Sequence, residues 1–406
     1  MTAPVLDATS PQFINNPYDK YAEFREQAAV GWVDSPYEMY WVFSHGLVTE
    51  VNQRRTEFLK PGKTRIGSKS GPFAVTNHLK DGLFFMDKDR HDDVRPLMDG
   101  IFHEAIAKAQ QHAEKVAEEL LDAALKNGQM DAIREFAGPL AERVFFQVMG
   151  VPEAACPLVN DWVRTALDSH RETMPPLQRL RGGTVSLAMR LFLRGLQQVA
   201  PKVAPGSILA GMQGATVCGA SGKRLDPDEA MNTAGHFALG GYLSTEFLIG
   251  TGIYNLLRHP EQWQQLRKDR ALMSRAVDEM LRYDAPFQLA DRWVENDTKL
   301  GDFTIPAGSV FAVAYGSANR DPAVFADPDR FDIARSQRKS DTEPTPNYGF
   351  GDGMHRCIGE WLARPVTAVA IAALLDRCPT ARIGEVGPWA ADPYFRSLTK
   401  LQLLLR

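Results

Sequence analysis

Cysteine is scarce in this 406-residue chain, and its four cysteines stand far apart. Cys156, Cys218, Cys357 and Cys378 form no C-x-x-C pair, so the pattern predicts neither a disulfide framework nor a structural zinc site. Unpaired cysteines in a chain of this size fit a reducing compartment best. We therefore expect the protein in the cytoplasm.

An excess of charge of one sign is also missing. Lys and Arg number 46 against 50 Asp and Glu, the formal net charge is −4, and neither sign forms a long block. Proteins that bind nucleic acids gather basic residues on one surface. The balance of charges therefore argues against nucleic acid as the main partner.

Long apolar segments and export signals are lacking too. Residues 203–222 are uncharged but are interrupted by Pro205 and repeated glycines, and the apolar residues 230–245 are too few to span a bilayer. Residues 1–16 have neither the basic start nor the apolar core of a signal peptide. We expect a soluble protein without a membrane partner. Because no internal repeat or long linker is found, residues 1–406 are expected to form a single domain.

The spacing of apolar residues predicts a mainly α chain with small β-sheets, which is the α+β class. Residues 132–149 show helical periodicity, and Gly150 follows them as a helix-capping glycine does. The predicted helices are residues 17–25, 103–126 and 132–149, and the predicted strands are residues 40–43, 309–313 and 398–405.

A long central helix is predicted to begin after Asp226. Asp226 is a favourable N-cap, Pro227 suits the first helical position, and two acidic residues follow in the first turn. No further proline occurs before Pro260. The helix would then run for about 31 residues, or roughly 46 Å at 1.5 Å per residue, so we expect it to be buried centrally.

The segment from Phe350 to Gly359, with the sequence FGDGMHRCIG, places one cysteine in the setting that a haem thiolate ligand needs. Its glycines allow a tight turn that lies flat against a planar ring. Residues 358–375 are predicted to be helical, which puts Cys357 at a helix N-terminus, where backbone N–H groups favour the thiolate. A thiolate bound to haem iron favours cleavage of the O–O bond on the opposite side.

This segment resembles the cysteine loop of the cytochrome P450 family, Phe-x-x-Gly-x-His/Arg-x-Cys-x-Gly. Phe350, Gly353, His355, Cys357 and Gly359 fill every fixed position. The resemblance extends from residue 17 to the C-terminus. It implies haem b with Cys357 as the axial iron ligand, and a triangular prism of helices with the haem between the long central helix and the helix that follows the cysteine.

Other family motifs are present by the same resemblance. Glu279 and Arg282 match the Glu-x-x-Arg helix, and Arg330 matches the later Pro-x-Arg-Phe segment, so the three are expected to form a buried ionic cluster. Removing one partner of such a cluster would leave an unpaired buried charge. The haem propionates, which need cationic or N–H partners, are assigned by family position to His91, Arg95, Arg292 and His355.

The long helix departs from the family pattern at its centre. Gly240 and Gly241 are expected to admit the flat cofactor, because two glycines in a helix cost about 1 kcal/mol each relative to alanine. Leu243 and Ser244 replace the usual acidic residue and threonine. Proton delivery is therefore assigned to Ser244 or Thr245 with ordered water, and Glu246 is the nearest acidic residue in sequence. This aliphatic-Ser-Thr sequence is similar to that of P450s that couple two aromatic rings of a cyclodipeptide.

Candidate substrate contacts follow from family position, and they favour a flat aromatic or apolar substrate over a sugar or phosphate. They are Phe73 within residues 73–78, Phe237, Leu239, Leu243, Phe287, Leu289, Ala290 and Phe395. Three functions remain open: radical C–C or C–N coupling of an aromatic substrate such as a cyclodipeptide, conventional hydroxylation or O-dealkylation of an aromatic or terpenoid compound, and a non-catalytic haem sensor or electron carrier.

Two motifs that would indicate nucleotide binding are incomplete in this sequence. The Gly62-Lys63-Thr64 run lacks the first glycine of a phosphate-binding loop, since Glu57 stands there, and the glycines near Cys357 do not make a dinucleotide fingerprint. No flavin or iron–sulfur motif is present. The family resemblance therefore implies O2 as co-substrate and electrons from a ferredoxin and its reductase, docking near the cysteine, where Arg356 offers positive charge.

Overall fold

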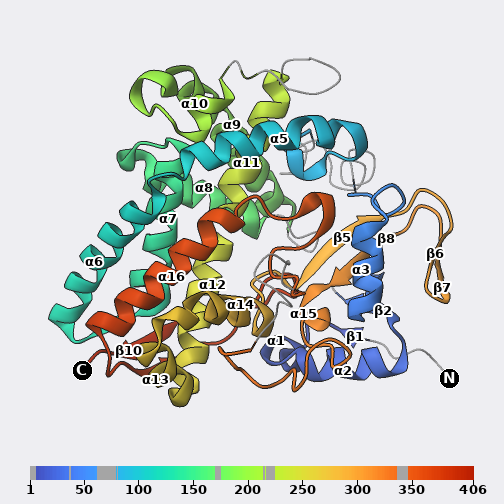
Figure 1. Cartoon of the computed structure of the whole chain (residues 1–406). Coiled ribbons are helices and arrows are strands. Elements are labelled where there is room, and N and C mark those ends of the chain that lie inside the picture. Colours follow the sequence, from blue (N-terminus) through green and yellow to red (C-terminus); the bar gives the residue numbers. More distant parts are fainter. Residues whose placement is uncertain are drawn as a thin grey trace. The chain divides into compact units, whose positions relative to one another are not determined.

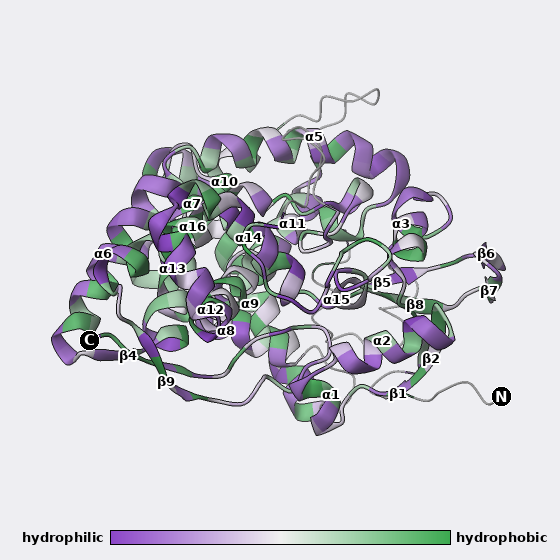
Figure 2. Ribbon diagram, turned by 60° about the horizontal axis from the view of Figure 1, so that its bottom comes forward, coloured by the Kyte–Doolittle hydropathy of each residue, from purple (hydrophilic) through white to green (hydrophobic). Residues whose placement is uncertain are grey.

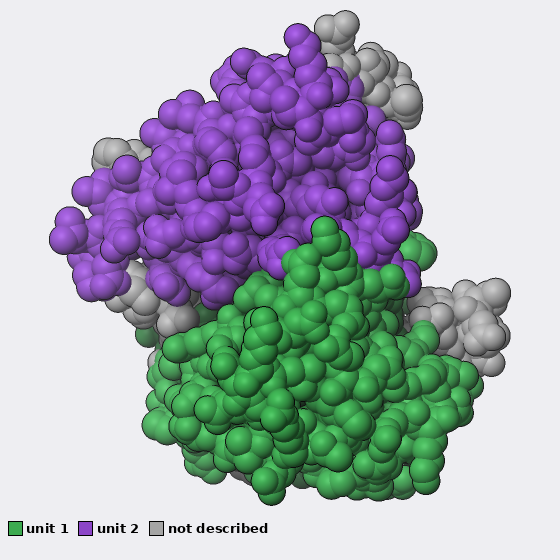
Figure 3. Space-filling view, turned by 90° about the vertical axis from the view of Figure 1, so that its left-hand side faces the viewer, with its two compact units in different colours: residues 1–58, 113–140, 244–406 green, residues 59–112, 141–243 purple. Residues whose placement is uncertain are grey.

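The computed structural model describes residues 6–35, 38–61, 79, 81–169, 175–213, 215, 225–335 and 346–406. The chain divides into two compact units, each assembled from separate segments (Figure 3). Unit 1 comprises Met1–Phe58, Ala113–Leu140 and Ser244–Arg406, and unit 2 comprises Leu59–His112 and Ala141–Leu243. The single domain expected over residues 1–406 stays a prediction.

Unit 2 is built from helices that pack around α9. α9 contacts α8, α10 and α11, so one long helix organises the unit. The elements that lie mainly in unit 2 are η2 (Leu83–Phe85), α5 (Lys88–Ala105), α7 (Gly138–Met149), η4 (Glu153–Ala155), α8 (Cys156–Asp168), α9 (Pro176–Val203), α10 (Ile208–Met212) and α11 (Pro227–Gly240).

Unit 1 combines helices with three small sheets (Figure 1). Its helical elements are α1 (Pro11–Asn15), α2 (Tyr18–Gln27), α3 (His45–Gln53), most of α6 (Ala109–Asn127), η3 (Ala132–Ala137), α12 (Leu243–Arg258), α13 (Pro260–Lys268), η5 (Arg270–Leu272), α14 (Met273–Tyr283), α15 (Tyr315–Ala318), η6 (Gly353–His355) and α16 (Glu360–Arg377). Its strands are β1 (Leu6–Asp7), β2 (Val30–Ser35), β3 (Met39–Val42), β4 (Gln129–Asp131), β5 (Leu289–Trp293), β6 (Thr298–Leu300), β7 (Phe303–Ile305), β8 (Val310–Ala314), β9 (Arg382–Val386) and β10 (Leu401–Leu404).

The largest sheet has the strand order β1-β2-β3-β8-β5, and helices cover both of its faces. Val48 and Val51 of α3 pack with Val313 on one face, while Phe13 of α1 and Phe24 of α2 pack on the other with Leu289 and Ala312. β5 pairs antiparallel with β8, with Arg292 opposite Phe311. The sheet therefore fixes the position of Arg292. The other sheets are β4-β10-β9 and the hairpin β6-β7.

Most of the predicted elements are confirmed. The strand predictions correspond to β3, β8 and β10, and the helix at residues 17–25 corresponds to α2. The helix at residues 132–149 is found as the π-helical turn η3 followed by α7, and Gly150 ends it with φ +89°. Helices such as α5 alternate hydrophilic and hydrophobic residues along the ribbon (Figure 2), with Val94, Met98 and Phe102 on the buried side.

The single helix predicted over residues 103–126 is wrong. α5 ends at Ala105 and α6 begins at Ala109, and the turn between them is closed by short-range hydrogen bonds, including Ala109 N–H to the Ile106 carbonyl at 2.9 Å. The apolar spacing continues across this turn, so periodicity alone did not reveal it.

The long helix predicted after Asp226 is interrupted. Its start is confirmed, because Asp226 and Glu229 form a reciprocal capping box, but α11 ends at Gly240 and α12 begins at Leu243. A Cβ at Gly241 would lie 2.1 Å from the Phe145 ring, and the fully buried Tyr242 packs on the same ring. Glycine therefore weakens the helix where aromatic packing draws the chain aside.

The helix after the cysteine begins later than residues 358–375 predicted. α16 starts at Glu360 with Gly359 as N-cap, so Cys357 precedes the first helical residue by three positions. Its sulfur nevertheless stays at this N-terminus, 3.4 Å from where a Cβ of Gly359 would stand. Among the helices of the described ranges, none is both long and apolar enough to cross a bilayer.

Candidate active site

The cysteine loop is held in shape by its own backbone. Cys357 N–H donates to the Phe350 carbonyl at 2.9 Å, and Gly351 N–H donates to the Tyr348 carbonyl at 2.9 Å. Gly351 and Gly353 have φ values of +66° and +70°. A Cβ at Gly353 would lie 2.6 Å from the backbone oxygen of Asn52. Glycine is thus required at residue 353 by conformation and by the approach of α3.

Cys357 presents its thiol differently from the other described cysteines. Cys357 is exposed, whereas Cys156 and Cys378 are buried. Burial raises the pKa of Cys156 to about 11 and raises that of Cys378, so both remain thiols at neutral pH. An accessible sulfur beside the N-terminus of α16 is suited to become a thiolate and a metal ligand.

Arg292 lies buried beside this loop and is held by neutral groups. It is 4% exposed, and its guanidinium donates to Asn52 Oδ1 at 2.9 Å, to the Tyr315 hydroxyl at 3.1 Å and to the Asp291 carbonyl at 2.9 Å. No carboxylate of the described residues pairs with it. A buried cation without a counter-charge calls for an anion. The residues present therefore fit a haem propionate.

The other loop residues support the same reading. His355 ends η6 and is half-buried. The Phe350 ring lies under the guanidinium of Arg364, 5.1 Å from its centroid, and Arg364 pairs with Glu360 and Asp278. These contacts join the loop to α14 and α16, so its position does not depend on the loop backbone alone.

Arg356 is less available than the sequence suggested. Its guanidinium pairs with Glu360 at 2.8 Å and is 30% exposed. Part of the positive charge expected for a docking surface near the cysteine is therefore compensated within the loop and the first turn of α16.

The remaining predicted propionate partners lie in unit 2. His91 and Arg95 stand one turn apart on α5. His91 is 3% exposed, and Arg95 pairs with Asp99 at 2.8 Å. Their contact with the cofactor stays a prediction.

The two glycines of the long helix have different surroundings. Gly240 is exposed, and a Cβ there would have no atom within 4 Å. A Cβ at Gly241 would overlap the Phe145 ring at 2.1 Å. Gly240 therefore has open space beside it, and its contact with the cofactor stays a prediction, whereas Gly241 is needed for packing within unit 2.

A pair of alanine variants separates these two roles. We expect Gly241→Ala to lower thermal stability sharply, because the new methyl group overlaps an aromatic ring, with a cost of about 1–3 kcal/mol. Gly240→Ala should leave stability unchanged or slightly raised, yet lower the haem content per protein, which absorbance spectra of the purified variants measure. An unchanged haem content in Gly240→Ala would contradict a cofactor contact at Gly240.

The predicted proton-delivery residues occupy the first turn of α12. Ser244 is half-buried, whereas Thr245 and Glu246 are each 5% exposed. The Glu246 carboxylate is turned toward Gly138, whose Cβ would lie 3.2 Å from Oε2. Since successive helical residues turn by about 100°, Ser244 and Glu246 face different sides of α12.

The buried ionic cluster exists, but one of its members was assigned wrongly. Arg282 and Glu279 are both fully buried and form a two-point ion pair at 2.7 and 2.8 Å. Arg330 is 65% exposed and faces Asp332, and it contributes only its backbone carbonyl to Arg282. The second arginine on Glu279 is Arg335, at 3.3 Å. The turn from Asp332 to Arg335 brings that side chain back to α14, while Arg330 points outward.

The predicted substrate contacts of unit 1 divide between two environments. Phe287 and Phe395 form an isolated β-bridge, with their rings edge to face at 4.9 Å, and Phe247 joins them at 6.0 Å. Leu289 is fully buried in the core with α1 and α2, and its contact with a substrate stays a prediction. Ala290 belongs to the opposite face of the sheet, because neighbouring strand residues alternate between faces.

The unit 2 candidates lie on α11 and at the start of α12. Phe237 meets Phe102 edge to face at 6.2 Å, Leu239 packs near Phe85 and Val185, and Leu243 is buried. Phe73 lies outside the described residues.

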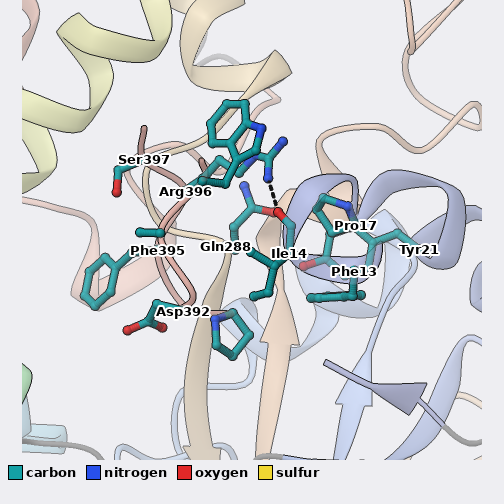
Figure 4. A pocket seen from close by; sticks show the side chains of 12 residues that line it. Phe13, Ile14, Pro17, Tyr21, Gln288, Asp392, Phe395, Arg396 and Ser397 are labelled. Carbon is teal, nitrogen blue, oxygen red and sulfur yellow. Dashed lines mark hydrogen bonds between the residues drawn. The ribbon is translucent and has the colours of Figure 1, made fainter. Parts of the chain in front are cut away.

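A small pocket of unit 1 also uses Phe395, together with α1 (Figure 4). Arg396 crosses it and donates to the Ile14 carbonyl at 2.7 Å, and its guanidinium lies 3.4 Å from the Trp389 ring centroid. Phe13, Tyr21 and Gln288 complete the wall. These contacts tie the C-terminal loop to the N-terminal helices.

Sequence reasoning missed several buried or paired residues of the two units. Asn52, Tyr315 and Arg335 meet their partners across long separations in the sequence, and no local pattern marks them. His236, on α11, has both ring nitrogens buried without a hydrogen-bond partner in the described part of the chain. Burial first and then the charge of Lys60 lower its pKa to about 3. It is therefore a neutral imidazole, able to donate one hydrogen bond and accept another.

An exposed thiol in a glycine-turned loop, beside a buried arginine that lacks a carboxylate, is the arrangement of a haem-thiolate protein. The cytochrome P450 family model matches residues 208–399. The 6-deoxyerythronolide B hydroxylase of Saccharopolyspora erythraea is 30% identical, covering 94% of this chain and 93% of that protein. The chain belongs to the cytochrome P450 family, whose cofactor is haem b with an axial cysteine thiolate.

Further similarities agree with this family. The biotin biosynthesis cytochrome P450 of Bacillus subtilis is 28% identical, over 97% of each chain. The solved structure of P450BioI in complex with a hexadec-9Z-enoic acid ligated acyl carrier protein superposes with a TM-score of 0.87 at 26% identity, covering 98% of this chain and 100% of that one. The predicted α+β cytochrome P450 fold is thereby confirmed.

Proposed function

We propose that this protein is a P450 monooxygenase that oxidises a small apolar or aromatic compound in secondary metabolism, with Cys357 as the axial ligand. The observation that carries the proposal is the exposed Cys357 thiol in a loop that lies against Asn52 and Tyr315, the hydrogen-bond partners of the buried Arg292. The similarity to the 6-deoxyerythronolide B hydroxylase supports oxidation of an organic compound by oxygen insertion. When bound, a haem with a thiolate ligand supplies the activation of O2.

The protein's own residues would then bind and orient the haem. Cys357 at the N-terminus of α16 would present its sulfur to the iron, and Gly359 leaves space beside it. Arg292 offers charge and N–H donors to a propionate. His355, His91 and Arg95 are further candidate propionate partners, and Gly240 leaves room for the ring.

The residues available for proton delivery bear on whether the reaction is oxygen insertion or radical coupling. Ser244 is the more accessible hydroxyl, while the Glu246 carboxylate faces Gly138, so the family's usual acid and threonine pair is incomplete here. O–O cleavage needs two protons in either reaction, and in radical coupling the acidic groups of the aromatic substrate would donate them in place of a protein relay. Coupling is therefore the second candidate function, favoured by Leu243 and Ser244 at these positions.

Electron supply and substrate delivery complete the proposal. A ferredoxin and its reductase would provide electrons on the cysteine side. The related structure solved with a ligated acyl carrier protein supports a substrate that arrives attached to a carrier.

The experiment is a reconstituted reaction with isotopically labelled O2, a ferredoxin system and a panel of aromatic and macrocyclic compounds, chosen by the spectral shift they cause in the haem. Label in the main product supports the monooxygenase, and an unlabelled coupled product supports the second candidate. No spectral shift with any compound and no substrate-dependent turnover would instead support a sensor or electron carrier.

A further inference from the structure

The outward side of α9 carries an unusual row of leucines. Leu177, Leu180, Leu187 and Leu191 are 77%, 42%, 44% and 60% exposed, and they are spaced so that they fall on one side of a helix. We call them the α9 stripe. The opposite side of α9, including Met189 and Leu193, is buried against its neighbours in unit 2. α9 is therefore apolar on both sides.

The α9 stripe is more than scattered surface leucines. More than half of the large exposed apolar side chains of the described ranges lie on this one helix. From Leu177 to Leu191 the stripe extends about 21 Å at 1.5 Å per residue. Single exposed leucines are ordinary, but four on one side of one helix, interrupted only by the exposed Thr184, indicate a binding surface.

The charged side chains of α9 itself have a single sign. The charged residues of α9 are Arg179, Arg181, Arg190, Arg194 and Lys202, and none is acidic. Arg190 is turned toward α11, where it pairs with Asp228 at 2.6 Å. Arg181 and Arg194 remain exposed along the two edges of the stripe. The surface is an apolar row with a basic rim, and it is complementary to an apolar row with an acidic rim.

The shape and charge of the α9 stripe distinguish between possible binding partners. A second copy of this chain on a two-fold axis would set the Arg181 and Arg194 edges against their own copies, which like charges oppose. A membrane is matched by a helix with a wide apolar face, whereas this stripe is a single row of side chains on a helix already packed in unit 2. A single row fits the groove of one facing helix.

The inward side of α9 shows what such a partner could do. Val185 of α9 packs in one cluster with Leu239 of α11, which is a predicted substrate contact. A protein on the α9 stripe would therefore lie one helix away from part of the proposed substrate pocket.

We propose that the α9 stripe with Arg181 and Arg194 docks an acidic helical carrier protein that presents the substrate. This inference rests on the proposed function and names the surface through which the substrate is delivered. The partner contributes acidic side chains to the two arginines and a row of apolar side chains to the leucines.

The test uses the purified holoenzyme and, as probe, a bacterial acyl carrier protein loaded with a fatty acyl chain, with binding measured by thermophoresis at low and high salt. We expect binding that weakens with salt, and a loss of about tenfold or more in affinity, equivalent to about 1.4 kcal/mol, in Arg181→Glu/Arg194→Glu and in Leu187→Ser/Leu191→Ser. Matched controls are Lys115→Glu on α6 and Val386→Ser on β9, which are exposed and lie outside α9.

Three results would overturn the inference. The first is no binding of the carrier by the unaltered enzyme, and the second is equal weakening of carrier binding by the control variants. The third is that the leucines are needed for binding to anionic phospholipid vesicles, or for self-association in sedimentation, in place of carrier binding. The reduced carbon monoxide spectrum and turnover of a free substrate report on the proposed function separately. A failed docking surface is therefore distinguishable from a failed enzyme assignment.

Discussion

Replacing Cys357 with alanine is expected to abolish both the red-shifted absorption of the reduced, carbon monoxide-treated protein and all turnover. In the haem-free protein the thiol is exposed, so its removal creates no cavity and should change the free energy of unfolding of the apoprotein by no more than about 0.5 kcal/mol. Loss of the spectrum in a variant whose apoprotein unfolds at the same denaturant concentration as the unaltered apoprotein would assign the sulfur to the iron rather than to the fold.

The matched control is Cys156→Ala. Cys156 is buried at the start of α8, and burial raises its thiol pKa to about 11, so it is a poor metal ligand. We expect this variant to keep the spectrum and to lose some stability. If Cys357→Ala retained the red-shifted band while Cys156→Ala lost it, the site would have to be placed elsewhere.

The local sequence was sufficient to predict the cysteine loop, because its function depends on residues that are close together in the chain. Gly353 must adopt positive φ and Cys357 must reach the N-terminus of α16, and both requirements lie within ten residues of chain. Arg292 was identified by family position, but its hydrogen-bond partners were not predicted. Its partners Asn52 and Tyr315 come from α3 and α15, and only the sheet β3-β8-β5 brings those elements together.

Periodicity failed where packing competes with helix formation. The residues after Asp226 keep helical spacing through Gly240 and Gly241, yet the Phe145 ring fills the space beside Gly241, Tyr242 packs on that ring, and the helix stops. Periodicity also says nothing about which face of a sheet a residue meets. Leu289 and Ala290 are adjacent in a strand and pack in the cores on opposite faces of the sheet.

The ionic cluster shows the limit of matching a motif in sequence. Pro328-Asp329-Arg330-Phe331 fits the family pattern, but the carbonyl of Arg330 accepts hydrogen bonds from Arg282 and Arg335, and its own side chain is solvated. Which arginine turns inward is decided by the turn after Asp332 and not by distance along the chain. A series of substitutions can distinguish the contribution of Arg330 from that of Arg335.

Glu279→Gln is expected to lower the free energy of unfolding by about 3–5 kcal/mol, because it leaves the fully buried Arg282 without its counter-charge. The carboxylate of Glu279 also accepts the Asp332 N–H at 2.9 Å and the Arg335 guanidinium, while Arg282 holds the carbonyls of Asn319 and Pro328. The pair thus fastens the chain before the cysteine loop to α14. Denaturant unfolding of the holoenzyme, followed by circular dichroism and by haem absorbance, measures the loss.

The companion variants are Arg335→Ala and Arg330→Ala. Arg335 is 12% exposed where it pairs with Glu279. Its loss should cost about 1–3 kcal/mol, because it removes a charged hydrogen bond as well as hydrogen bonds to three backbone carbonyls. Arg330 is 65% exposed, and its truncation should stay within about 0.5 kcal/mol, as for other surface changes. Equal costs for the two variants would show that the cluster closes through Arg330 in solution, and the orientation of the whole segment before the cysteine loop would then have to differ from the one described.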